Sequence, residues 1–408
     1  MFLHFGVNTF TDREWGDGTE SPAIFNPPAL DARQWTRTAR AAGFRAVILT
    51  AKHHDGFCMW PTKTTTHSVA SSPWRSGRGD VVREFVDACR AEGLRAGLYL
   101  SPWDRNHPLY GDSPRYNDVY CDQLTELLTR YGKLAEVWFD GANGEGPNGK
   151  KQQYDWPRVW ALVRRLQPDT VMFSDAGPDV RWNGNENGTA GEPNWATVDP
   201  TRVPFPGVSG PGVIDALQHG DPRGTIWRPA EADVSIRPGW FHHPAEDGRV
   251  KSAQTLMNLY LRSVGRNAKL LLNVPPARTG LLHDTDISSL TQCRDLRRAA
   301  FGRDAAAGRR ISWRPTDIGG LTGDLDLGRD VTIGFLRLEE DITKGQAVSR
   351  YIVSALGVLD SWREVARGTT IGHARIEALS AVRTRRLRVT IESIGAPVTV
   401  TVRAFEAQ

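Results

Sequence analysis

The sequence predicts a (β/α)8-like barrel followed by a smaller antiparallel β-sandwich. Up to about residue 300, short apolar strands alternate with amphipathic helices, and each crossover is long enough to join two parallel strands. Beyond about residue 308, strands with period-two alternation follow one another with no convincing helix between them. We therefore expect a barrel domain over residues 1–305 and a β-sandwich over residues 306–408.

The alternation can be followed in chain order. Strands are predicted at 4–10, 45–51, 95–101, 135–141, 170–177, 225–235 and 268–276, and helices at 31–44, 80–93, 116–132 and 156–167. About seven such units favour a closed barrel over a doubly wound sheet. No GxGxxG follows a strand and no P-loop occurs, which also argues against a nucleotide-binding fold.

Composition excludes several classes of partner. The 51 basic and 47 acidic residues are interspersed, and the basic run at 383–388 lies inside an alternating strand pattern without stacking aromatics, so no nucleic acid is expected. No apolar run approaches the roughly 18 residues of a membrane span, so no membrane association is expected. No signal peptide is visible, but the chain opens almost directly in a strand, so secreted and cytoplasmic locations both stay open.

The predicted strands end in residues that carry chemistry. In parallel barrels the reactive groups come from the carboxyl ends of the strands. The residues at these ends are His4, His53, His54, Tyr99, Asp140, Asp175 and Glu231. Asp140 closes the apolar strand "VWFDG", where a carboxylate is costly unless it is partnered or used. Acids, imidazoles and some of the 14 tryptophans in one pocket suit glycoside hydrolysis, with indole faces stacking on sugar rings.

The adjacent pair His53 and His54 has competing interpretations. Neighbouring residues of a strand point to opposite faces, so the two imidazoles cannot chelate one ion unless the strand has ended, and the H-x-H pattern of metal barrels is absent. The four cysteines are scattered, without a CxxC pair. We therefore expect no metal and no cofactor. A structural histidine pair and binding of sugar hydroxyls both stay open.

Several motifs resemble one known family. "HFGVNTFTDREWGDG", "AVILTAKHHDGFCMWPT", "GLYLSPWD", "EVWFDGANG", "RWNGNENG", "SIRPGWFHH" and "LLLNVPPARTGLL" occur in the order seen in the α-L-fucosidases, family 29 of the glycoside hydrolases. The resemblance runs from about residue 1 to 290. It implies a retaining α-L-fucosidase acting on fucosylated oligosaccharides or glycoconjugates, with a galactose-binding-like β-sandwich appended, and leaves the oligomeric state open.

The resemblance also implies roles for individual residues. Asp140 matches the nucleophile of the family. The matching fucose-binding positions are His4, Glu14, His53, His54, Tyr99 and Trp138, with Trp60 and Trp240 as further walls of the pocket.

Two glutamates compete for the role of general acid/base. Glu186 lies in "RWNGNENG" and Glu192 in "AGEPNW". "RWxGNE" resembles the branch of the family that prefers α-1,3/4-linked fucose on branched, Lewis-type glycans, which favours Glu186. Retaining enzymes place their two carboxyl groups about 5–5.5 Å apart. Indole walls and the charge of Asp140 are expected to raise the pKa of Glu186 and keep it protonated.

Two alternatives to this hypothesis stay open. The first is a catalytically inactive carbohydrate-binding protein on the same barrel. The second is a glycosidase of another barrel family with similar acids. The three histidines at positions 4, 53 and 54 argue against the second alternative by resemblance.

Overall fold

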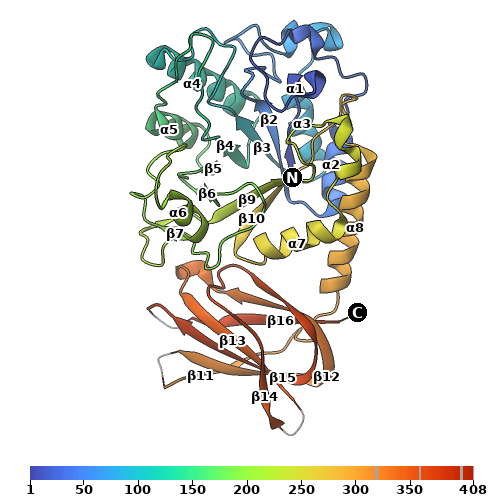
Figure 1. Ribbon diagram of the computed structural model, residues 1–408, viewed down its shortest axis with the longest axis vertical. Helices are drawn as coiled ribbons and strands as arrows, with labels where there is room; N and C mark the ends of the chain where they lie inside the picture. The colour runs from blue at the N-terminus through green and yellow to red at the C-terminus, as the bar shows by residue number, and fades with distance from the viewer. Residues whose placement is uncertain (318–319, 358–359, 396–397, 408) are drawn as a thin grey trace.

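The protein consists of a closed parallel barrel and an antiparallel sheet that lies beneath it in Figure 1. The computed structural model describes residues 1–317, 320–357, 360–395 and 398–407. The predicted order of the two folds is confirmed.

Eight parallel strands close the barrel in the order β1-β10-β9-β6-β5-β4-β3-β2. Their bounds are Phe2–Leu3 (β1), Ala46–Lys52 (β2), Arg95–Leu100 (β3), Glu136–Trp138 (β4), Val171–Ser174 (β5), Val180–Trp182 (β6), Ala230–Ser235 (β9) and Ala268–Asn273 (β10). A two-stranded ribbon, β7 (Thr197–Val198) with β8 (Ile226–Trp227), lies outside this closed sheet. The barrel departs from strict alternation at β5 and β6, which pair in parallel across a short loop without a helix.

Because side chains alternate along each strand, the strands place apolar residues in the barrel interior and polar residues at its mouth. One apolar side chain from each of six strands forms the inner cluster: Phe2, Ile48, Tyr99, Trp138, Phe173 and Leu271. Residues two positions further along share the same face of a strand. For β1, β4, β5 and β10, these positions are His4, Asp140, Asp175 and Asn273. The pattern that packs the interior therefore also directs polar groups to the carboxyl end.

Helices cover the outside of the barrel. They are α1 (Val7–Thr11), α2 (Ala32–Ala42), α3 (Val81–Ala91), α4 (Ser113–Arg130), α5 (Trp156–Leu166), α6 (Val213–His219), α7 (Ala253–Ser263) and α8 (Asp284–Phe301). Asp31, Asp80 and Asp155 accept backbone N–H groups at the starts of α2, α3 and α5, which fixes where these helices begin. None of the helices in the described ranges combines the length and apolarity that crossing a membrane requires.

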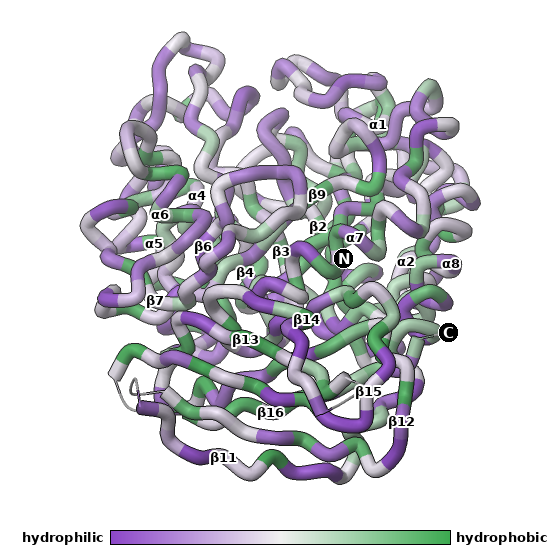
Figure 2. The backbone as a smooth tube through the Cα atoms, turned by 60° about the horizontal axis from the view of Figure 1, so that its bottom comes forward, coloured by the Kyte–Doolittle hydropathy of each residue, from purple (hydrophilic) through white to green (hydrophobic). Residues whose placement is uncertain are grey.

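The C-terminal domain is a six-stranded antiparallel sheet. Its strands are β11 (Ser312–Pro315), β12 (Leu321–Glu340), β13 (Val348–Leu356), β14 (Trp362–Gly368), β15 (Arg375–Ser393) and β16 (Val400–Glu406). The long strands β12 and β15 pair with each other along most of their length, and the sheet encloses a second apolar core. Apolar and polar residues alternate along these strands in Figure 2. Ala306 already belongs to this core, just beyond the end of α8.

The C-terminal sheet contacts the barrel at the end opposite its mouth. Gln346 accepts the backbone N–H of Ala196, and the hydroxyl of Thr370 accepts that of Asn194. Asn194 in turn donates to the backbone oxygens of Arg266 and Asn267, which precede β10. These contacts lie at the amino ends of the strands. The sheet therefore supports the floor of the barrel, away from the carboxyl ends.

Candidate active site

A cavity of about 440 Å³ opens at the carboxyl ends of the barrel strands, within the usual range of small-molecule sites. Its lining consists of Phe2, His4, Glu14, Trp15, His53, His54, Tyr99, Trp138, Asp140, Gly141, Ala142, Asp175, Trp182, Glu186, Asp233 and Trp240. The cavity brings together most of the site residues predicted from the sequence, but Trp60, Glu192 and Glu231 are not part of its lining.

Two imidazoles in the cavity have a defined tautomer. Asn273 uses its amide N–H group to donate to the carbonyl of Trp240, so its Oδ1 faces His4 Nδ1 at 2.9 Å and accepts from it. The hydroxyl of Ser101 donates to a backbone carbonyl and so accepts from His54 Nδ1 at 2.7 Å. In each neutral ring the other nitrogen, Nε2, is then an acceptor. Both rings can therefore accept a hydrogen bond from a ligand hydroxyl.

Burial keeps the three histidines uncharged. Desolvation lowers the pKa of His4 to about 3 and lowers the pKa of His53 well below its ordinary value. The pKa of His54 is also lowered by burial, although the nearby Asp140 opposes this shift. Neutral imidazoles suit recognition of hydroxyl groups better than recognition of anions.

Asp140 is held in place through both of its oxygens. The hydroxyl of Tyr99 donates to Oδ2 at 3.0 Å, and the backbone N–H of Ala142 donates to Oδ1 at 2.7 Å. His54 Nε2 lies 4.0 Å from Oδ2. The next residue is Gly141, where a Cβ atom would come within 2.4 Å of the Asp175 carboxylate and 2.9 Å of the backbone nitrogen of Gly207, so a larger residue would require both to shift. Asp140 is therefore an oriented, partly exposed carboxylate at the mouth of the barrel.

Glu186 lies at the same cavity on the loop after β6. Trp240 Nε1 donates to its Oε2 at 3.3 Å. Burial raises the pKa of Glu186, the hydrogen bond from Trp240 lowers it, and the negative charge of Asp140 raises it again; the net shift is upward. A second carboxyl group with a raised pKa thus shares the cavity with Asp140.

Glu14 fixes the loop that carries Trp240. Its carboxylate accepts the backbone N–H groups of Trp240 and Phe241, and His243 Nε2 lies 2.9 Å from Oε2. A Cβ atom on Gly239 would approach this carboxylate to 2.7 Å, so the loop passes closely over it. Glu14 therefore positions one wall of the cavity, and its contact with sugar stays a prediction.

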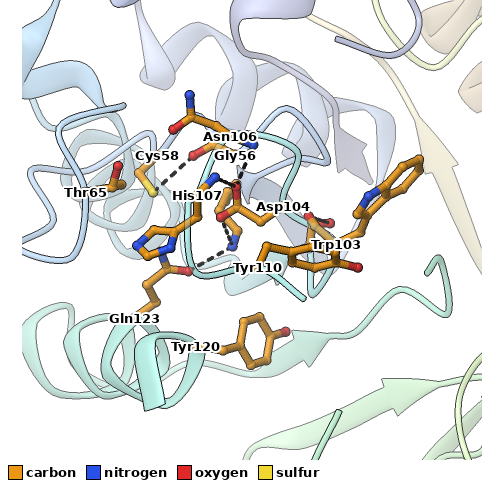
Figure 3. A network of polar contacts seen from close by, with 12 residues as sticks. Gly56, Cys58, Thr65, Trp103, Asp104, Asn106, His107, Tyr110, Tyr120 and Gln123 are labelled. Atoms are coloured by element: carbon orange, nitrogen blue, oxygen red, sulfur yellow. Dashed lines mark hydrogen bonds and ion pairs between the residues drawn. The ribbon is translucent and has the colours of Figure 1, made fainter. Parts of the chain in front are cut away.

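A buried polar network supports the loop that carries His53 and His54. Lys52 donates to Asp104, Tyr116 and Gln123, and neither Lys52 nor Asp104 is exposed to solvent. Asp104 also accepts backbone N–H groups of the loop that follows β3, as Figure 3 shows. The backbone oxygen of His54 accepts the N–H of Arg105, which joins the two loops.

Trp138 rests on a buried charge cluster in the barrel interior. Its Nε1 donates to Glu231 at 2.9 Å, and its ring stacks on Phe173. Lys269 forms ion pairs with Glu231 and Glu136. The prediction that Glu231 lies among the groups at the mouth is wrong: Glu231 is the second residue of β9 and lies below the cavity, completely buried.

The prediction that Trp60 is a wall of the pocket is also wrong. The chain reverses after Asp55, and Cys58 forms a bridge back to Lys52, so Trp60 packs into the core behind the strand. Its indole is fully buried and donates to Glu126 of α4 at 2.8 Å. Trp60 contributes to stability there and does not line the cavity.

Glu192, the other candidate acid, is engaged elsewhere. It forms ion pairs with Arg375 of the C-terminal sheet at 2.5 Å and with Arg266 at 3.3 Å. It is not part of the cavity lining. Its position at the contact between the two domains indicates a structural role.

Two further carboxyl groups line the cavity: Asp233, which was not predicted from the sequence, and Asp175, which was predicted only as a strand-end residue. Asp233 lies two residues after Glu231 on the same face of β9, accepts from Trp182 Nε1 at 2.8 Å, and has its pKa raised well above the ordinary value by burial. Burial also raises the pKa of Asp175 to about 6. The sequence "EAD" could have predicted Asp233, because residues two apart in a strand share a face and Asp233 lies closer to the carboxyl end than Glu231. Trp15, 56% exposed, is a further aromatic wall at the cavity.

Comparisons with known proteins identify the family of this chain. The family model described as alpha-L-fucosidase matches residues 4–295. The chain is 42% identical to Alpha-L-fucosidase 1 of Arabidopsis thaliana over 96% of its own length and 81% of the relative. A glycoside hydrolase 29 family member from an unknown rumen bacterium superimposes with a TM-score of 0.90 at 40% identity, covering 100% of this chain and 74% of that one.

A Ruminococcus gnavus GH29 fucosidase in complex with fucose superimposes with a TM-score of 0.87 at 29% identity, covering 100% of this chain and 92% of that one. In these comparisons, 96–100% of this chain is covered at 29–42% sequence identity. The chain belongs to the α-L-fucosidase family, family 29 of the glycoside hydrolases, and is an α-L-fucosidase.

Proposed function

We propose that this α-L-fucosidase is a retaining enzyme, with Asp140 as the nucleophile and Glu186 as the general acid/base. The observation that carries the proposal is the shared cavity of these two carboxyl groups, while Glu192 is ion-paired at the domain contact. An oriented carboxylate suits attack on the anomeric carbon, and a carboxyl group with a raised pKa suits proton donation.

The reaction has two steps. In the first, an Asp140 oxygen bonds to the anomeric carbon, the glycosidic bond breaks, and the proton of Glu186 goes to the leaving oxygen. In the second, Glu186 takes a proton from water as the water oxygen displaces Asp140. Tyr99 and the backbone N–H of Ala142 hold Asp140 in place for both steps. The acceptor nitrogens of His4 and His54 are suited to bind fucose hydroxyls.

We also propose a preference for α-1,3/4-linked fucose on branched, Lewis-type glycans. The support is the loop sequence "RWNGNENG" around Glu186. Exposed aromatic surface at the mouth, at Trp15, offers room to stack a second sugar.

Substrate linkage and stereochemistry test these proposals together. The wild-type enzyme should cleave Lewis-type trisaccharides with a kcat/KM at least about tenfold above that for an α-1,2-linked fucoside, a difference of about 1.4 kcal/mol in transition-state binding. Proton NMR of the earliest product should show α-fucose, because two displacements retain configuration. β-Fucose as the first product would contradict the retaining mechanism, and equal rates would contradict the linkage preference. No hydrolysis at all would favour the inactive carbohydrate-binding alternative.

The pH dependence of kcat/KM tests the role of Glu186. The hydrogen bond from Trp240 stabilises the ionised carboxylate, so removing it in Trp240→Phe should raise the pKa of Glu186 further. The acid must be protonated, so the alkaline limb of the kcat/KM profile should move to higher pH. Trp15→Phe is the matched control, because Trp15 lines the cavity without a hydrogen bond to Glu186. An equal shift in both variants, or a shift to lower pH in Trp240→Phe, would contradict the assignment.

A further inference from the structure

A second cluster of polar side chains lies outside the catalytic cavity, beside the start of α8. It consists of His242, Asp247 in the 3-10 helix η4 (Pro244–Arg249), and His283. One ligand-type atom from each of the three residues lies within 4.8 Å of the others. None of them lines the catalytic cavity.

The buried histidine of this cluster lacks ordinary partners. The side chain of His242 is 4% exposed, and neither of its ring nitrogens makes a well-formed hydrogen bond within the described ranges. Its Nε2 faces Asp247 Oδ1 at 3.2 Å. Buried polar atoms without partners are rare in folded proteins and call for an explanation such as a bound ion or water.

The other two side chains are arranged around the same point. His283 Nε2 lies 3.5 Å from Asp247 Oδ2, while its Nδ1 lies 2.7 Å from the hydroxyl of Thr285 and faces the backbone N–H of Thr285 at 3.4 Å as the N-cap of α8. Metal-binding histidines donate from their second ring nitrogen, so binding of an ion at Nε2 requires the tautomer in which Nδ1–H donates to the Thr285 hydroxyl. Zinc bonds of about 2.0–2.1 Å in a tetrahedron place ligand atoms about 3.3 Å apart. The separations of 3.2 Å from His242 to Asp247 Oδ1 and 3.5 Å from His283 to Asp247 Oδ2 are close to this value. They run to different carboxylate oxygens, so binding of one ion requires a small shift of His283, which is about one-third exposed.

The charges near the cluster permit a divalent cation. Arg237 is fully buried and donates to Asp247 at 2.8 Å and to Asp286 at 3.0 Å. One guanidinium and two carboxylates sum to one negative charge while the imidazoles are neutral. Arg237 therefore orients Asp247, and the second carboxylate balances the positive charge of Arg237.

We propose that His242, Asp247 and His283 form a Zn²⁺ site that ties the loop after β9 to the start of α8. Two imidazoles and one carboxylate are a typical donor set for zinc, with water completing the shell. Trp240 lies two residues before His242, so the ion stabilises the loop that forms one wall of the catalytic cavity. The catalytic reaction itself does not involve this ion, and the site is independent of the proposed linkage preference.

Metal titration of chelator-treated, untagged protein tests the proposal. Calorimetry with ZnCl₂ should show one ion per chain with a Kd in the micromolar range or tighter, and a rise in Tm that grows with zinc concentration. Co²⁺ should give the visible absorption bands of a four-coordinate site. His283→Asn should weaken binding at least about a hundredfold, because it removes one of three ligands while asparagine keeps a good helix N-cap.

The matched control is His219→Asn. His219 is likewise about one-third exposed and lies 3.9 Å from a carboxylate, but it is outside the cluster. This variant should bind zinc like the wild type. The proposal is overturned if the wild type binds no zinc, if His283→Asn binds as tightly as the wild type, or if added fucose displaces the ion. The last result would place the ion on the catalytic histidines.

Discussion

Asp140→Gly should retain the fold and lose at least about four orders of magnitude in kcat, because the variant has no group to form the covalent intermediate. The side chain is partly exposed and packs in no apolar core, so its removal leaves the barrel interior intact. Steady-state kinetics with a natural oligosaccharide measure the loss in kcat, and circular dichroism and Tm show whether the fold is retained.

The configuration of the product that Asp140→Gly forms with azide is a second test of the nucleophile. With an activated aryl α-fucoside, azide should enter the space of the missing carboxylate and attack once, giving the β-fucosyl azide. Asp175→Asn is the matched control, since Asp175 is a neighbouring carboxyl group of the same cavity. It should lose far less activity and give no azide product of inverted configuration. Near-normal kcat in Asp140→Gly would remove Asp140 from the role of nucleophile.

Glu186→Ala should lower kcat/KM about 10³-fold or more on natural oligosaccharides and much less on aryl fucosides with good leaving groups. A sugar leaving group needs its oxygen protonated as the bond breaks, whereas an activated phenol departs largely unaided. Azide should accelerate turnover of the aryl substrate by attacking the covalent intermediate without a general base. The product should be the α-fucosyl azide, opposite in configuration to the product of Asp140→Gly.

Glu192→Ala is the control for this experiment. It breaks the ion pairs with Arg375 and Arg266, so the expected effect is a lower Tm with nearly unchanged kcat. If Glu192→Ala instead shows the dependence on leaving group and the azide product while Glu186→Ala stays active, the acid/base role belongs to Glu192. The proposed linkage preference would then lose its main support.

Much of the scaffold could be predicted because barrel strands carry a local signal. The alternation in "VWFDG" places Trp138 toward the interior and Asp140 two positions later on the same side, and the structure shows both at the cavity. Helix starts were also predictable, since Asp31 and Asp80 have the capping chemistry that begins α2 and α3. The helices α7 and α8 were not among the predicted elements, and the apolar periodicity of α8 is weak.

The loops set the limit of such prediction. Trp60 and Trp240 both follow predicted strands and were both predicted as walls of the pocket, yet one is in the core and the other at the cavity. Trp60 turns inward because its loop folds back on β2, whereas Glu14 holds the loop of Trp240 over the barrel mouth. The periodicities of two and 3.6 residues predict strands and helices, but they do not predict the course of either loop.

The sequence by itself determined the parallel barrel, the C-terminal sheet and the position of Asp140 at a strand end, because each follows from local periodicity and chain order. Only the tertiary structure decided which carboxyl groups share the cavity with it. Glu186 and Glu192 are six residues apart in one loop, but one accepts from Trp240 and the other pairs with Arg375, 183 residues away along the chain. Contacts between residues so distant arise from packing of whole domains, which local pattern does not specify.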